Sequence, residues 1–158
     1  MIIHPVTVIL ARPTTRLGRT RITLTPGVID EWAEEMFGHG MCHALASAIH
    51  AITDWPFAII EQREWYEWRA KHVGVVTPKG YFLDIRGTHL MQIRDEGRIR
   101  RPAMLRDVMA AFGLTIVYGL SWSESQRSDW WTKLFPAEAN EIIWQFATQL
   151  IFRARCAR

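Results

Sequence analysis

The chain has few cysteines, no long apolar run and little net charge, and each shortage removes a class of protein. Its 158 residues include two cysteines, Cys42 and Cys156, which are too few and too far apart for a disulfide framework. No apolar run approaches the ~20 residues that a membrane-spanning helix needs. The formal net charge is only +3, which does not by itself indicate a nucleic-acid partner.

What remains is the composition of an ordinary globular protein. Hydrophobic residues make up 49% of the chain and charged residues 22%. A chain of this length fits one domain, so we expect residues 1–158 to form a single α+β domain that buries roughly 70% of its unfolded surface. The start lacks the basic leader of a signal peptide, which predicts a cytoplasmic protein. We expect no membrane association, no metal and no organic cofactor, and the sequence leaves the oligomeric state open.

Hydrophobic periodicity and turn residues predict a central antiparallel sheet with helices packed on it. Thr25 and Pro26 suit the N-cap and first position of one helix, and Gly38 to Gly40 suit its end. A second helix is expected from about Met41 to Thr53. The remaining expectations are strands over 6–10, 21–24, 57–60, 72–76, 81–85 and 114–120, a polar and aromatic connection over 61–70, and helices over 102–112 and 136–153.

Cys42 is the residue with the most chemical promise, because it lies in the first turn of the second predicted helix. The positive end of the helix dipole and unpaired N–H groups stabilise a thiolate there. The same N–H groups can hold the oxyanion that forms when sulfur attacks a carbonyl. On this helix we expect Leu45, Ala46, Ile49 and Ile52 to face the core, and His43, Ser47, His50 and Asp54 to face solvent.

The stretch KHVGVVTPKGYFLDIRG predicts a hairpin with a three-residue loop at Pro78-Lys79-Gly80. That loop length pairs Val75 with Leu83 and puts His72 and Asp84 on the same face as diagonal neighbours. A two- or four-residue loop would put them on opposite faces. Gly74, between them, is expected to leave space over the sheet for the helix that carries Cys42.

The order of these features resembles the papain-like cysteine hydrolases, most closely their transglutaminase-like and NlpC-type peptidase branches. The resemblance covers roughly residues 38–87: a glycine before Cys42, a Trp55-Pro56 break, His72 at a strand start and Leu83-Asp84 on the next strand. It implies a papain-like fold in which Cys42 is the nucleophile, His72 the general base and then acid, and Asp84 the residue that orients His72. It also implies a protein or peptide substrate, attacked at an amide, isopeptide or glutamine carbonyl.

Four further residues are candidates for binding the oxyanion or the substrate. Papain-type enzymes carry a glutamine shortly before the cysteine as an oxyanion donor, and in this chain His39 is the candidate to replace it. Gly40 is expected to let a substrate approach the backbone. Trp65 and Trp68 precede the histidine strand and are expected either to line a substrate cleft or to pack on the core as a lid.

Other interpretations of the same residues stay open. Cys42 suits a small buried core residue, since free cysteine is among the most buried types. His43 and His50 are ~10 Å apart along a helix, too far to bind one metal ion, and His39 or His89 are alternative bases.

The alternative function is a non-enzymatic interaction protein, such as a phage or mobile-element product, that binds a partner through tryptophan-rich loops near Trp130 and Trp131 and an arginine-rich face. That face comprises Arg94, Arg98, Arg100, Arg101 and Arg106, which also suit a solvated, self-paired surface or nucleic-acid contacts.

Overall fold

The computed structural model describes residues 3–65, 67–89, 92–94, 98–100, 114–120 and 139–156. These residues form an α+β structure in which all strand pairs are antiparallel, as the sequence predicts. The elements in chain order are β1 (Val6–Ile9), β2 (Arg21–Leu24), α1 (Glu31–His39), α2 (Cys42–Thr53), β3 (Phe57–Glu64), β4 (Glu67–Val76), β5 (Phe82–Asp84), β6 (Gly87–His89), β7 (Gln92–Arg94), β8 (Arg98–Arg100), β9 (Leu114–Leu120) and α5 (Asn140–Cys156).

The largest sheet has the strand order β6-β5-β4-β3-β9. β4 and β5, which carry His72 and Asp84, are therefore interior strands with a neighbour on each side. β3 and β4 form a long hairpin that pairs from Phe57 with Val75 to Glu64 with Glu67. The prediction of a connection over 61–70 is therefore wrong, because both strands continue through it. The polar, charged sequence of this stretch lacks the buried alternating face by which a strand is recognised.

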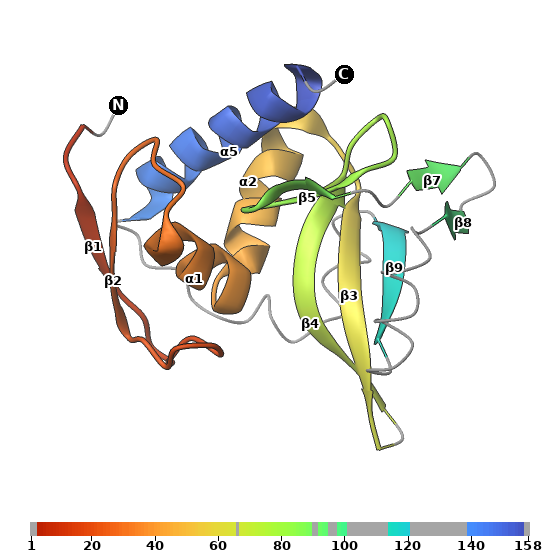
Figure 1. Cartoon of the computed structure of the whole chain (residues 1–158), viewed down its shortest axis with the longest axis horizontal. Helices are drawn as coiled ribbons and strands as arrows, with labels where there is room; N and C mark the ends of the chain where they lie inside the picture. The colour runs from red at the N-terminus through yellow and green to blue at the C-terminus, as the bar shows by residue number, and fades with distance from the viewer. Residues whose placement is uncertain are drawn as a thin grey trace.

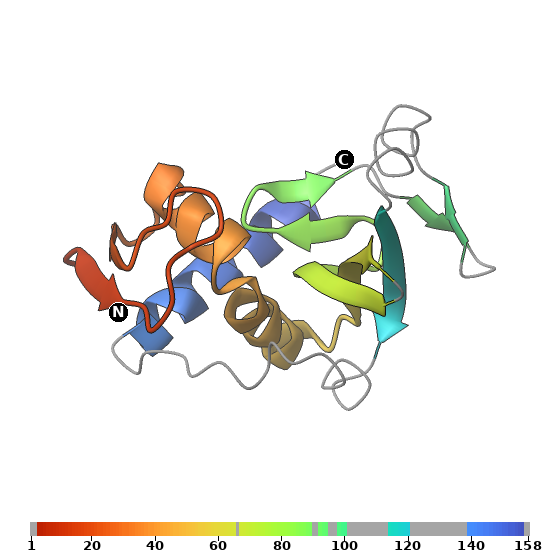
Figure 2. The same cartoon turned by 90° about the horizontal axis from the view of Figure 1, so that it is seen from below.

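The helices lie between this sheet and the β1–β2 pair, as two views at right angles show (Figure 1, Figure 2). α2 contacts β4 on one side and α5 on the other, which makes it the central helix of the core. α5 turns five large apolar residues into the core: Ile142, Ile143, Phe146, Leu150 and Ile151. Together with Phe37, Leu45, Ile49 and Phe57 they form one continuous apolar core.

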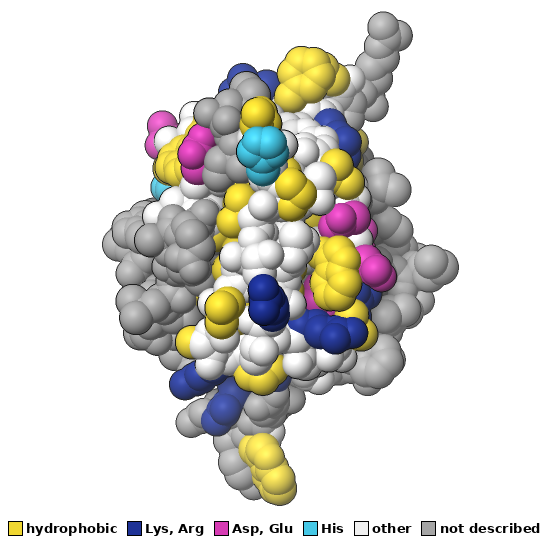
Figure 3. Space-filling view, turned by 90° about the vertical axis from the view of Figure 1, so that its left-hand side faces the viewer, with side chains coloured by type: hydrophobic (Ala, Val, Ile, Leu, Met, Phe, Trp, Pro, Cys, Tyr) yellow, Lys and Arg dark blue, Asp and Glu magenta, His cyan; other side chains and the backbone are white. Residues whose placement is uncertain are grey.

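The β1–β2 pair covers the far side of the helices. Alternation along these strands sends Val8, Ile22 and Leu24 into the core, whereas Thr7 and Thr23 form a hydroxyl–hydroxyl hydrogen bond of 2.9 Å on the outer face. Seen from this side, hydrophobic side chains are scattered among charged and polar ones (Figure 3). Both strands lie where the sequence predicts them.

The start of α1 corrects the prediction of a helix from Thr25-Pro26. Gly27 has φ of +74°, a left-handed conformation that ends any helix begun at Pro26. The Val28 N–H instead closes a turn on the Thr25 carbonyl (3.1 Å). The helix begins after Asp30, whose carboxylate accepts hydrogen bonds from the N–H groups of Trp32 (3.1 Å) and Ala33 (3.0 Å).

Several expectations concern residues outside those that the structure describes. These are the helix over 102–112, the loop around Trp130 and Trp131, and Arg101 and Arg106. The backbones of Trp68, His89, Arg94, Arg98 and Arg100 lie in strands, but their side chains are not described. None of the helices in the described ranges combines the length and the apolar character that crossing a lipid bilayer requires.

Candidate functional site

α2 begins at Cys42, which delivers the thiol to the first turn of the central helix. The N-cap residue is Met41, whose side chain makes no capping hydrogen bond, and its N–H is taken by the Met36 carbonyl (2.6 Å). The first N–H in this turn that can serve an oxyanion is therefore the one on Cys42 itself. The Cys42 residue is only 7% exposed, so the thiol is buried.

The β4–β5 hairpin has the predicted register. Val75 pairs with Leu83 and Val76 with Phe82, and the Thr77 N–H donates to the Tyr81 carbonyl (2.8 Å). Gly80 has φ of +81°, the left-handed conformation that closes the three-residue loop. This register puts His72 and Asp84 on one face of the sheet, where they meet.

His72 and Asp84 form a directional contact within the sheet. His72 Nε2 lies 2.8 Å from Asp84 Oδ2, and the side chains are 13% and 4% exposed. The other carboxylate oxygen, Oδ1, accepts the backbone N–H of Arg86 (2.8 Å). Both carboxylate oxygens are thus bonded, which fixes the acid and, through it, the orientation of the imidazole.

The Cys42 sulfur is adjacent to the His72 ring and accepts the backbone N–H of Val73. Because Asp84 engages Nε2, the nitrogen left to face the sulfur is Nδ1, which is buried and has no hydrogen-bond partner in this structure. The structure therefore brings Cys42, His72 and Asp84 together in a single chain of contacts. We call these three residues the Cys–His–Asp triad.

The charges of the thiol and the imidazole are coupled. Burial raises the pKa of Cys42, but contacts with His43, His72 and the Val73 N–H more than offset this and lower it from 9.0 to about 6. Burial lowers the pKa of His72, but its hydrogen bond to Asp84 and the neighbouring Cys42 sulfur raise it from 6.5 to about 10. The two opposite pKa shifts both favour the thiolate–imidazolium pair over the neutral pair.

His43 is the site residue that sequence reasoning missed. We expected it on the solvent face of α2, but it is 5% exposed and its ring contacts the Cys42 sulfur. Ile52, which we expected to face the core, is 41% exposed. Both errors arise because α2 is covered by β4 and α5 on different sides, so its buried surface is not the single stripe that the sequence shows.

Gly74 has a different role from the one expected. A Cβ at this position would overlap the carbonyl oxygen of Leu83 and the ring of Phe82. The space over Gly74 is therefore filled by β5 and not by the cysteine helix. The Phe82 ring that occupies it lies 5.9 Å from the His72 ring, centroid to centroid, and so packs against the imidazole.

His39 and Gly40, the candidates for oxyanion or substrate binding, lie at the end of α1, immediately before Cys42. His39 Nε2 lies 3.1 Å from Arg86 Nη2, which makes the ring nitrogen an acceptor. A Cβ on Gly40 would contact Met36, Thr14 and Leu10, so this glycine faces protein and does not open a path for substrate. His39 remains a candidate at the rim of the site.

Trp65, a candidate for the substrate cleft, lies at the tip of the β3–β4 hairpin and is 91% exposed. It lies seven positions before His72, or roughly 20 Å along an extended strand. The structure therefore does not bring Trp65 to the triad. The backbone of Trp68 lies in the same outer part of β4, opposite Arg63.

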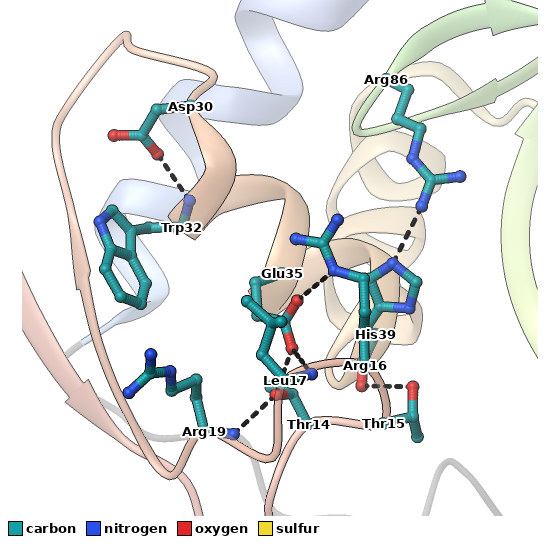
Figure 4. A network of polar contacts seen from close by, with 10 residues as sticks. All are labelled: Thr14, Thr15, Arg16, Leu17, Arg19, Asp30, Trp32, Glu35, His39 and Arg86. Carbon is teal, nitrogen blue, oxygen red and sulfur yellow. Dashed lines mark hydrogen bonds and ion pairs between the residues drawn. The ribbon is translucent and has the colours of Figure 1, made fainter.

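A buried carboxylate supports the end of α1. Glu35 accepts hydrogen bonds from the Thr14 hydroxyl, from Arg16 Nε (2.8 Å) and from the Leu17 N–H (2.8 Å), which fixes the loop over residues 14–19 (Figure 4). Burial raises the pKa of Glu35, but these donors outweigh it and hold the pKa below 4.5. Thr15, in the same loop, donates through its N–H (2.7 Å) and hydroxyl (3.1 Å) to the His39 carbonyl. The loop thus caps the helix that leads into Cys42.

Within the described residues, no three His, Cys, Asp or Glu side chains gather closely enough to hold a metal ion. Comparison with protein-family models, with characterised proteins and with solved structures gives no match for this chain.

Proposed function

We propose that the protein is a thiol-dependent hydrolase or acyl-transferase that acts on an amide, isopeptide or glutamine carbonyl through Cys42, His72 and Asp84. The observation that supports this most is the buried contact chain from sulfur to imidazole to carboxylate. It favours the ionised pair at neutral pH, which is the reactive form of a cysteine nucleophile. A cysteine kept only for packing needs neither a charged partner nor a carboxylate behind that partner.

The reaction would begin with attack of the Cys42 thiolate on the carbonyl carbon. The electrons of the C=O bond move to oxygen, and the N–H of Cys42 at the start of α2 stabilises that oxyanion. The His72 imidazolium then gives its proton to the leaving nitrogen as the C–N bond breaks, which leaves a thioester on Cys42. Neutral His72 next takes a proton from water, or from an acceptor amine, which attacks the thioester and releases the acyl group.

A papain-like arrangement of this kind would account for the placement of the three residues. The nucleophile lies at the start of a central helix, and the histidine and the acid lie on adjacent strands of an antiparallel sheet that the helix contacts. The register of the β4–β5 hairpin sets the imidazole–carboxylate pair. The contact of α2 with β4 holds the Cys42 sulfur next to the His72 ring.

The proposal is tested by acylation with p-nitrophenyl acetate, a donor small enough for the limited access to Cys42. A Cys156→Ser chain should release nitrophenolate in a burst and gain one acetyl group at Cys42, seen by intact-protein and peptide mass spectrometry. The matched Cys42→Ser, Cys156→Ser chain should show no burst. A His72→Asn chain should acylate slowly, because it lacks the imidazolium that stabilises the thiolate.

No burst and no acetyl group at Cys42 in a folded chain would overturn the proposal. The interaction protein considered above would then be the better account of the fold.

A further inference from the structure

Arg86 lies two residues beyond the triad acid, in the turn between β5 and β6, and its side chain is directed back over the end of α1. Its backbone N–H bonds to Asp84 Oδ1 (2.8 Å), and its Nη2 lies 3.1 Å from His39 Nε2 (Figure 4). A Cβ built on Gly38 would lie 3.3 Å from the same Nη2. The guanidinium is therefore held over the helix end that leads into Cys42, although the residue is exposed.

The guanidinium has no acidic partner in the part of the chain that the structure describes. Among the described residues, no carboxylate pairs with it, and its side-chain hydrogen bond goes to a neutral ring nitrogen. Burial, followed by the Arg86 charge itself, lowers the pKa of His39, which favours the neutral ring with Nε2 as the acceptor. A guanidinium has five N–H donors in a planar fork, and this contact leaves most of them for a ligand.

Arg86 is held near the triad by two hydrogen bonds, one from its backbone and one from its side chain. Its backbone is bonded to the carboxylate that orients His72, and its side chain is bonded to the residue three before Cys42. His39 also experiences the charge of His72, so the two imidazoles lie within electrostatic range. An arginine that is held in place at the edge of a site without a carboxylate partner can bind a planar anion. Two of its N–H groups then donate to two oxygen atoms of that anion.

We propose that Arg86, positioned by His39, binds a carboxylate of the substrate next to the carbonyl that Cys42 attacks. This inference rests on the proposed function and names its substrate class: a peptide or other amide with a free carboxylate close to the scissile bond. The competing explanation is that Arg86 only stabilises the C-terminal end of α1 through the helix dipole.

The test compares two alkylating agents that differ in charge, iodoacetamide and iodoacetate, on the Cys156→Ser chain. Both react with the same sulfur, and only iodoacetate carries a carboxylate. An Arg86→Gln variant should lower the rate with iodoacetate about twofold to fivefold, the effect of one partly screened ion pair, and leave the iodoacetamide rate nearly unchanged. High salt should shrink the difference between the two chains. An Arg86→Lys variant should recover part of the iodoacetate rate, because it restores the charge without the fork.

Arg153→Gln is the matched control, since it removes the same charge from an exposed position in the last turn of α5. That turn packs beside Trp55, which follows the C-terminal end of α2, roughly 18 Å from Cys42 along the helix axis. The control should leave the ratio of the two rates unchanged.

The outcomes separate the two proposals. An equal loss with both reagents, or an unchanged ratio in Arg86→Gln, would overturn the carboxylate subsite and leave the thiol chemistry intact. Slow alkylation of Cys42 by iodoacetamide in the parent chain, no faster at pH 7 than a free thiol, would count against the proposed function itself.

Discussion

Replacing Asp84 with asparagine removes the charge behind His72 while keeping the size of the side chain. The carboxylate serves two donors, His72 through Oδ2 and the Arg86 N–H through Oδ1. Asparagine has one oxygen, so one of these two donors must face an NH2 group. The substitution therefore removes a charge-assisted hydrogen bond and leaves a buried donor without its acceptor.

The size of the effect follows from the His72 pKa, which the site raises from 6.5 to about 10. At 1.36 kcal/mol for each pKa unit, this is about 5 kcal/mol in favour of the imidazolium, contributed mainly by Asp84 and Cys42 against burial. If Asp84 contributes about half, its loss costs about 2 to 3 kcal/mol and lowers the His72 pKa by ~2 units. Because His72 is then less often protonated, it stabilises the thiolate less. The Cys42 pKa should rise by ~1 to 2 units, and the thiolate population at pH 7 should fall from about 90% to half or less.

The assay is the pH dependence of iodoacetamide alkylation in the Cys156→Ser background. Asp84→Asn should shift the midpoint of the profile upward by ~1 to 2 pH units and lower the urea midpoint of unfolding. Asp54→Asn is the control, because Asp54 is exposed at the C-cap of α2 in a left-handed conformation that asparagine adopts readily. An unchanged midpoint in a folded Asp84→Asn chain would refute the coupling of acid, imidazole and sulfur.

Three further predictions follow from the buried charges. His43→Leu should raise the midpoint of Cys42 alkylation, because it removes a contact that lowers the thiol pKa; an unchanged midpoint would show that His43 only fills space. Glu35→Gln should lower the free energy of unfolding by about 1.5 to 3 kcal/mol in urea titration, since its donors lose a charged acceptor, and a loss below ~0.5 kcal/mol would contradict this. The free energy of unfolding should be flat between about pH 6.5 and 9.0. There the gain from Cys42, whose folded pKa is lowered from 9.0 to about 6, offsets the loss from His72, whose folded pKa is raised from 6.5 to about 10. Above pH 9.0 the His72 contribution continues to fall and stability should drop by up to ~1.4 kcal/mol per pH unit, and a continuous slope across the plateau would contradict the ion pair.

The β4–β5 hairpin was predictable because local turn chemistry determines its register. Pro78 and Gly80 allow a three-residue loop, and that loop length alone decides whether His72 and Asp84 share a face. The start of α2 was predictable for a similar reason, since the break at Gly38 to Gly40 is local in sequence. Features encoded within about ten residues can be read from the sequence.

Features that depend on distant contacts could not be read in this way. His43 is buried because β4 and α5 pack on two sides of α2. The residues near His43 in the sequence do not indicate either contact. Glu35 resembles a solvent-facing helix residue until the loop over residues 14–19 supplies its three donors. The Arg86–His39 contact joins residues that are 47 positions apart.

The most direct measurement of the central claim is the ionisation of Cys42 itself, followed by thiolate absorbance in the ultraviolet. The Cys156→Ser chain is titrated against the Cys42→Ser, Cys156→Ser chain, so that the difference reports one sulfur. The account predicts a midpoint near pH 6, in line with a thiolate held by His43 and His72. A midpoint near the ordinary value of 9.0 would show that the sulfur and the imidazole do not share a charge, and would contradict the account.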